Sequence, residues 1–290
     1  MSELIRQALI DGEAAGARYA LTPPRAAVHG LLGAQLANRP GSSIEFMDYR
    51  EYQLGDDLRR VDWSAYARTD RLIVKLYREE VSPHLDLVID GSRSMALPGS
   101  RKAQGAAALA AVLATAAATS GFTHATYLAA AHCAPLPNGH DRPSAWQGLS
   151  FDYAGDPEQA LHRSPPAWRR RGVRVLISDL LWLGEPLPLV SRLAQGAAAV
   201  VVIQVLAQAD AEPPQRGNLR LEDAETGQVR ELFVDAAAQQ RYRDALARHQ
   251  DHWSRACRQV GTMMTTLIAE RLLEDWSLSD LVAAEFLRVV

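Results

Sequence analysis

A short run of apolar residues that ends on an aspartate is the feature that most constrains the fold of this chain. Leu85, Leu87, Val88 and Ile89 lie within five residues, and Asp90 is followed by Gly-Ser-Arg-Ser. Such a run is too short for a typical globular helix and rich enough in branched side chains to indicate a buried strand.

The turn after this strand brings one carboxylate and two hydroxyls, from Asp90, Ser92 and Ser94, into one small volume. Ligands of open α/β sheets collect at the carboxyl ends of strands. Oxygen donors of this kind are the ligands of Mg²⁺ or Ca²⁺. Considered alone, the motif fits equally well an Asx-turn, in which the same side chains bond nearby backbone amides.

A second stretch repeats the pattern. Residues 173–180 read Val-Arg-Val-Leu-Ile-Ser-Asp-Leu, a buried strand that ends at Asp179, and the preceding residues 169–172 are expected to end a helix. Cations at the carboxyl end of a helix complement its dipole. Two parallel strands that each end in aspartate favour a real cation site over an isolated structural role for either residue.

The order of helices and strands predicts the fold class. Apolar strands alternate with helices, which is typical of a doubly wound, mainly parallel, Rossmann-like α/β sheet. We expect residues 1–80 to form an N-terminal helical and β extension and residues 81–290 the main domain. The expected elements of the main domain are a helix over 100–120, a strand over 122–131, a helix from 185, a strand over 196–207, a hairpin over 219–234, a helix over 235–260, a strand over 262–269 and a terminal helix over 278–287.

The N-terminal third is different in character. Thr22-Pro23-Pro24 predicts a helix start, residues 38–41 predict its end, residues 54–57 predict a tight turn and residues 72–77 predict a strand. Over residues 42–80, charges of alternating sign lie between aromatic side chains, which indicates arginine–carboxylate pairs packed on rings. This surface either docks a partner or braces a small subdomain. The candidate partner-binding residues are Arg50, Asp56, Asp57, Arg59, Asp62, Trp63 and Arg68.

These motifs together carry a family resemblance. The pattern that begins Phe46-x-x-Tyr49-Arg50 and continues through Gly55-Asp56-Asp57 and Asp62-Trp63 to Asp90-x-Ser92-x-Ser94 resembles the bacterial family catalogued as domain of unknown function 58. The core of that family is similar to the von Willebrand factor type A domain. The resemblance covers about residues 40–235. It implies a metal-ion-dependent adhesion site, usually for Mg²⁺, and association with MoxR-type AAA+ ATPases, but no established catalytic activity.

One loop departs from the type A pattern, in which a threonine precedes the next helix and binds the metal. Residues 132–157, expected to form a long surface loop, contain no threonine. Asp156 is the substitute candidate because the turn at residues 154–158 should open a helix. An ordinary N-cap before Pro157 is the equal alternative.

Other classes of function find little support. The eight histidines form no H-E-x-x-H set, and neither a G-x-S-x-G elbow nor a P-loop is present, so we expect no enzyme. A net charge of −3 gives no positive field for nucleic acid. The two distant cysteines, the absence of a signal-peptide pattern and apolar stretches shorter than a bilayer span predict a cytoplasmic protein without a membrane span.

The sequence therefore predicts a metal-dependent protein-interaction module. Asp90, Ser92, Ser94 and Asp179, with Asp156 as a further candidate, would hold Mg²⁺, or else Ca²⁺ or Mn²⁺, and an acidic group of a partner would complete the site. By the resemblance, the module would serve a MoxR-type ATPase in assembling or activating a client protein. The alternative is a metal-free scaffold that docks partners through residues 42–80, and a Mg²⁺-dependent hydrolase is less favoured.

Overall fold

The computed structural model describes all residues except 23–44, 54–55, 79–82 and 225–226. The chain forms two compact units: residues 1–27 with 83–290, and residues 28–82. The sequence prediction placed the boundary after residue 80 and grouped the N-terminal residues with the extension. The described residues 1–22 belong to the large unit.

A six-stranded sheet forms the centre of the large unit, in the order β11-β8-β7-β4-β5-β6. All neighbouring pairs are parallel except β5 and β6. This confirms a mixed α/β fold with a mostly parallel, Rossmann-like sheet. The strands are β4 (His84–Asp90), β5 (Thr123–Ala129), β6 (Cys133–Pro135), β7 (Val173–Ser178), β8 (Ala199–Leu206) and β11 (Met263–Ile268).

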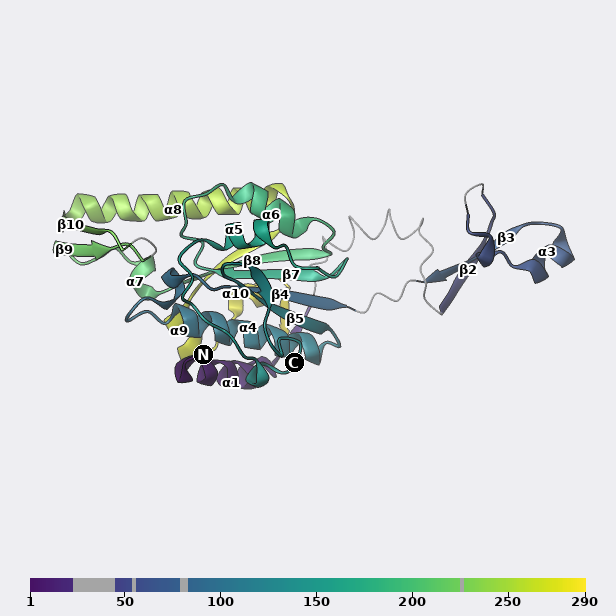
Figure 1. Ribbon diagram of the computed structural model, residues 1–290, viewed down its shortest axis with the longest axis horizontal. Helices are drawn as coiled ribbons and strands as arrows, with labels where there is room; N and C mark the ends of the chain where they lie inside the picture. The colour runs from purple at the N-terminus through teal and green to yellow at the C-terminus, as the bar shows by residue number, and fades with distance from the viewer. Residues whose placement is uncertain (23–44, 54–55, 79–82, 225–226) are drawn as a thin grey trace. The chain divides into compact units, whose positions relative to one another are not determined.

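Helices cover both faces of this sheet (Figure 1). Each face of the sheet carries a hydrophobic cluster that the helices bury. In β4, for example, Leu85, Leu87 and Ile89 belong to the first cluster and Val88 belongs to the second. The first cluster is covered by α1 (Glu3–Gly16), α4 (Lys102–Thr119), α9 (Ala269–Asp275) and α10 (Ser279–Ala283). The second is covered by α5 (Pro157–Arg163), α6 (Pro186–Ala194) and α8 (Ala236–Gln259).

Helix α4 packs closely against the sheet because ten of its 18 residues are alanine. The segment 106–114 is fully buried. Helix α1 approaches it so closely that a Cβ on Gly12 would lie 2.4 Å from the carbonyl oxygen of Ala108. Small residues on both helices therefore allow a backbone contact that larger ones would block.

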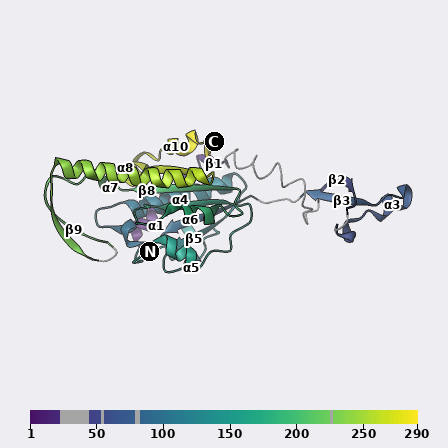
Figure 2. The same ribbon diagram turned by 90° about the horizontal axis from the view of Figure 1, so that it is seen from above.

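A hairpin of β9 (Gly217–Glu222) and β10 (Val229–Val234) follows the short helix α7 (Gln208–Ala211). It precedes α8, which Figure 2 shows lying along the large unit. Asp235 begins α8 by accepting a hydrogen bond from the backbone N–H of Ala238 at 2.6 Å. The predicted hairpin and the predicted cap of α8 are both confirmed.

The smaller unit is a β-hairpin with two short helical turns. Strand β2 (Glu45–Glu51) pairs with β3 (Ile73–Arg78), and between them lie the 3-10 turn η1 (Leu58–Arg60) and α3 (Trp63–Thr69). The predicted strand over 72–77 is confirmed by β3. The predicted helix after Thr22 and the first residues of the predicted turn at 54–57 lie outside the described residues.

Three sequence predictions were wrong in the large unit. The arginines at 169–171 do not end a helix, because α5 ends at Arg163 and the residues before β7 are irregular. The loop over 132–157 is not entirely a surface loop, since Trp146 and Leu149 are buried in the core. The terminal helix is shorter than predicted, and the chain then forms β12 (Leu287–Val289), which pairs with β1 (Tyr19–Leu21).

Candidate functional site

Strands β4 and β7 end side by side, and this register brings the predicted carboxylates together. Ile89 pairs with Ile177, so Asp90 and Asp179 leave the sheet at the same edge. Both side chains are buried. The hydroxyl of Ser178 donates a hydrogen bond to Asp90 Oδ2 at 2.6 Å, which joins the two strand ends.

The serine turn closes over Asp90. The backbone N–H of Ser92 donates to Asp90 Oδ1 at 2.8 Å, as an Asx-turn requires, and the hydroxyls of Ser92 and Ser94 lie 3.0 Å apart. Ser92 is buried and Ser94 is half-buried. The structure thus contains both the turn and the group of oxygen atoms that the sequence left as alternatives.

The charged form of Asp90 is disfavoured at this position. Burial raises the pKa of Asp90 to about 7, and repulsion from Asp179 adds to the effect, against the hydrogen bonds from Ser178 and Ser92. A buried carboxylate beside another is disfavoured in its charged form. A positive charge near Asp90 would therefore be bound favourably.

Lys102, whose role sequence reasoning missed, supplies a positive charge to Asp179. Its ammonium lies 2.8 Å from Asp179 Oδ2 and 3.0 Å from Asp210 Oδ2, and the side chain is 1% exposed. Burial works against the charge, but the two carboxylates outweigh it and raise the pKa of Lys102. The sequence feature that could have indicated this role is a single lysine at the start of an alanine-rich, mostly apolar helix.

The remaining groups around Asp179 are held in place as well. Asp179 Oδ1 accepts a hydrogen bond from the N–H of Leu181 at 3.1 Å. Its backbone carbonyl accepts one from the buried Gln204 side chain at 2.9 Å. Lys102 and Leu181 thus engage both carboxylate oxygens, so a metal ion would have to share Asp179 with them.

Asp156 begins α5 as an N-cap, the second of its two predicted roles. Its carboxylate accepts hydrogen bonds from the backbone N–H and the side-chain amide of Gln159, at 3.1 and 3.3 Å. The loop before it nevertheless lies against the serine turn, because Tyr153 pairs with Ser92 and accepts a hydrogen bond from the N–H of Arg93. The structure therefore brings the 152–156 loop to the site without placing the Asp156 carboxylate in it.

Asp90, Ser92 and Ser94 offer oxygen atoms of the kind that hard divalent cations prefer, with Asp179 as a neighbouring charge. Both Asp90 oxygens already accept hydrogen bonds, from the N–H of Ser92 and the hydroxyl of Ser178, so a metal ion would have to share Asp90 as well. Within the described residues, no group of three or more His, Cys, Asp or Glu side chains could hold a metal ion. The candidate site has only two carboxylates, and its other oxygen atoms come from serine hydroxyls. It therefore contains fewer than three residues of the types His, Cys, Asp and Glu.

The predicted partner-binding residues lie in the smaller unit and divide into two kinds. Arg50 pairs with Asp56 at 2.6 Å, and Arg59 pairs with Asp57 at 3.0 Å. Asp62 caps α3 through the N–H groups of Ser64 and Ala65 and pairs with Lys75 at 3.2 Å. These contacts support the bracing role.

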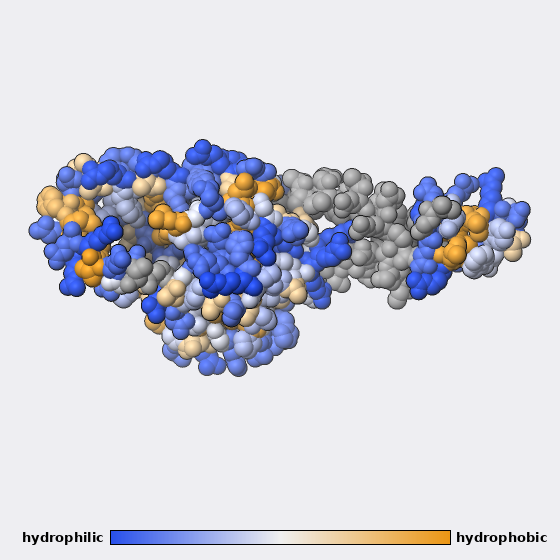
Figure 3. Space-filling model, turned by 45° about the horizontal axis from the view of Figure 1, so that its top comes forward, coloured by the Kyte–Doolittle hydropathy of each residue, from blue (hydrophilic) through white to orange (hydrophobic). Residues whose placement is uncertain are grey.

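Trp63 and Arg68 lie on the exposed side of α3. The Trp63 side chain is 57% exposed and packs edge-on against Tyr66 at 6.2 Å. Arg68 donates to the carbonyl of Ser64 within the helix. Figure 3 shows hydrophobic side chains on the surface of this unit. Leu58 and Leu72 are exposed hydrophobic residues of the same unit.

Comparison with known proteins supports the family resemblance. The family model described as "Protein of unknown function DUF58" matches residues 48–252. An uncharacterized protein of Mycobacterium bovis is 32% identical over 272 residues, which cover 87% of this chain and 82% of the relative. An uncharacterized protein of Mycobacterium tuberculosis matches to the same extent.

Solved structures resemble the chain only weakly. The conserved hypothetical protein BatB from Bacteroides thetaiotaomicron has a TM-score of 0.36 and 14% identity, covering 69% of this chain and 99% of BatB. An aerotolerance-related membrane protein from Bacteroides fragilis has a TM-score of 0.35 and 15% identity, covering 67% and 98% of the two chains. No helix in the described part of this chain is long and apolar enough to cross a membrane. The family match spans most of the sequence, and the chain belongs to the DUF58 family of proteins of unknown function.

Proposed function

We propose that this protein is a metal-dependent protein-interaction module of the von Willebrand factor A type, which binds an acidic group of a partner through a divalent cation. The observation that carries the proposal is the convergence of Asp90, Ser92 and Ser94 at the strand end beside Asp179. The raised pKa of Asp90 supports it, because the buried carboxylate lacks a full counter-charge.

Mg²⁺ is the proposed ion, and Ca²⁺ or Mn²⁺ would use the same oxygen donors. Asp90, Ser92 and Ser94 would hold it, and Lys102 would keep Asp179 in position beside it. A bound cation supplies a positive charge that attracts a partner's carboxylate, and such charge-assisted bonds are strong in a partly dehydrated site. The protein itself performs no covalent chemistry in this proposal.

By family resemblance, the partner machinery is a MoxR-type AAA+ ATPase acting on an unidentified client protein in the cytoplasm. The two free, buried cysteines, Cys133 and Cys257, agree with a reducing compartment. The experiment is a pull-down of the full chain with a MoxR-type ATPase, with Mg²⁺ and with EDTA. We expect ATPase or client capture that EDTA removes and Mg²⁺ restores.

Ser94→Ala is the variant for this experiment because Ser94 is only half-buried and its loss removes one hydroxyl donor. Ser100→Ala, outside the turn, is its matched control. Loss of capture in Ser94→Ala alone supports the site. Capture that is equal in both variants and insensitive to EDTA contradicts the metal-dependent mechanism.

The exposed aromatic pair on α3 favours a second candidate, a metal-free scaffold that docks partners through the 42–80 surface. Trp63 and Tyr66 are exposed, and tryptophan and tyrosine are enriched among the residues that dominate binding at protein interfaces. Trp63→Ala would then abolish capture while EDTA has no effect. The two candidates therefore give opposite results in the same pull-down.

A further inference from the structure

A cavity lies at the opposite end of the sheet from Asp90. Strand β4 runs from His84 to Asp90, which separates its two ends by roughly 20 Å. The cavity has a volume of about 840 Å³ and includes His84 in its lining. This volume lies within the range of ligand-binding pockets. The cavity is therefore distinct from the candidate cation site.

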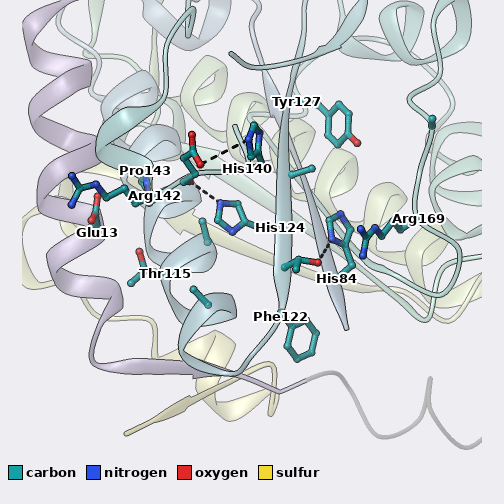
Figure 4. A pocket seen from close by; sticks show the side chains of 16 residues that line it. Glu13, His84, Thr115, Phe122, His124, Tyr127, His140, Arg142, Pro143 and Arg169 are labelled. Atoms are coloured by element: carbon teal, nitrogen blue, oxygen red, sulfur yellow. Dashed lines mark hydrogen bonds and ion pairs between the residues drawn. The ribbon is translucent and has the colours of Figure 1, made fainter. Parts of the chain in front are cut away.

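The cavity has an apolar floor, and its rim carries charged groups of both signs (Figure 4). The floor includes Ala114 and Ala118 of α4, Ala125 of β5, and Phe122 between these two elements. The rim carries His140, Arg142 and Arg169 together with the carboxylates Glu13 and Asp141. Glu13 accepts a hydrogen bond from the N–H of Ser144, and Asp141 lies 3.8 Å from His140. Figure 4 shows Arg169 on the other side of the cavity from Glu13, so the negative group of a ligand would be attracted to Arg169.

The edge of strand β5 lies in this cavity. β5 pairs with β4 from Thr123 onward, but with β6 only from Tyr127. The N–H of Thr123 bonds toward β4, so the main chain of the next residue, His124, faces the other way. Thr126, two residues further, faces the same way and bonds to Gly139 and Leu136.

The main chain of His124 has no hydrogen-bond partner within the described part of the chain. Its side chain is bound by the carbonyl of Asp141 at 3.0 Å, and burial lowers the pKa of this histidine. An unpaired N–H and C=O in a pocket form a template for one residue of an extended peptide, the mode called β-augmentation. The open edge is short, so it suits a peptide end and not a long strand.

Arg169 supplies a positive charge in this cavity, beside His84 (Figure 4). Its side chain is exposed. His84 is already engaged, with Nδ1 at 2.7 Å from the Thr123 hydroxyl and Nε2 at 3.3 Å from Asp86. The Tyr127 hydroxyl, whose pKa burial raises to about 12, is engaged by Asp86. Arg169 is thus the group best able to bind a carboxylate.

We propose that this cavity binds the carboxyl-terminal end of a partner polypeptide. The peptide main chain would pair with His124, an apolar side chain would contact Ala118 and Phe122, and the terminal carboxylate would meet Arg169. This interaction needs no metal ion and is independent of the Asp90 site. It would give the protein a second contact with a partner, at the other end of the sheet.

The test is isothermal titration of the full chain with N-acetylated tripeptides that end in leucine, phenylalanine or alanine. Each is compared with its C-terminal amide, which keeps the main chain and side chains but lacks the carboxylate. We expect at least one free acid to bind at least tenfold more tightly than its amide, equally well in Mg²⁺ and in EDTA. Equal affinity of acid and amide, or no binding of any peptide at millimolar concentration, overturns the proposal.

Two variants locate the binding. Arg169→Ala should weaken the acid at least fivefold, while Arg170→Ala, an exposed neighbour outside the cavity, should leave it unchanged. Ala118→Leu should abolish binding by filling the cavity, and because Ala118 is exposed, its melting temperature should stay close to that of the native chain. Equal weakening by both arginine variants contradicts the location.

A third comparison separates a peptide from a small organic anion. Hexanoate carries an apolar group and a carboxylate but has no main chain to pair with β5. We expect hexanoate to bind at least tenfold more weakly than the best tripeptide. Equal affinity would assign the cavity to small organic anions and overturn pairing with the strand edge.

Discussion

Carboxylates in the two units of this molecule experience opposite environments. Burial raises the pKa of Asp90 at the end of β4, whereas hydrogen bonds from Arg50 and from backbone N–H groups lower the pKa values of Asp56 and Asp62 in the smaller unit. The smaller unit pairs its charges locally and near the surface. The large unit buries two carboxylates together and pairs Asp179 with Lys102, whereas the charged form of Asp90 is disfavoured by burial and by repulsion from Asp179. Balanced charges of the first kind stabilise a fold, while the second kind attracts a cation.

Lys102→Met should have the largest effect on stability. Removing the ammonium leaves the buried Asp179 and the half-buried Asp210 without their counter-charge, and breaking a buried pair costs about 3–5 kcal/mol. Urea unfolding measures the loss. Lys75→Met in the smaller unit is the matched control, because its partner Asp62 is also bound by two N–H groups and Lys75 is partly exposed. Similar losses in both variants would contradict the contrast between the two units.

Asp156→Ala should have a moderate effect. The substitution removes the N-cap of α5 and should lower the free energy of unfolding by about 1 kcal/mol. Asp156→Thr keeps a capping oxygen and should lower the free energy of unfolding by only a few tenths of a kcal/mol. Mg²⁺ affinity in Asp156→Thr then decides the second role: an altered affinity places Asp156 near the ion, and an unchanged one removes it from the site.

Acid should destabilise the smaller unit by a small amount. A carboxylate whose pKa is lowered by folding stabilises the fold above its unfolded pKa, near 4, and this stabilisation is lost as pH falls through the folded value. Hydrogen exchange of residues 45–51 should therefore become faster, relative to the intrinsic rate, between pH 5 and pH 3. Asp56→Asn should show less of this pH dependence, and an equal dependence in both would contradict the assignment.

The periodic features of the sequence predicted most of the large unit. The apolar runs that became β4, β7 and β8 could be read directly, because a strand buried on both faces is mostly apolar, and one polar residue within each strand (Asp86, Arg174 and Gln204) did not hide the pattern. Asp235 as the cap of α8 was also predicted. The arginines at 169–171 led to a wrong prediction of a helix end, because a basic cluster is compatible with a helix end but does not require one.

The candidate site could be predicted only in part. Asp90, Ser92, Ser94 and Asp179 meet because register and strand order bring them together, and a sequence pattern can suggest both. Lys102 and Asp210 could not be found in this way, since their contacts with Asp179 depend on how α4 and α7 pack against the sheet. The contacts of α1 with α4 likewise depend on tertiary packing, and α1 was not predicted.

The central claim, that the Asp90 turn binds a divalent cation, is tested most directly by the melting temperature measured against Mg²⁺ concentration. Binding to the folded state stabilises by mass action, about 2.7 kcal/mol at one hundred times the dissociation constant. The account predicts a rising melting temperature for the native chain and for Ser100→Ala, a smaller rise for Ser94→Ala, and none for Asp90→Asn. A melting temperature that does not respond to Mg²⁺, Ca²⁺ or Mn²⁺ in the native chain would contradict it.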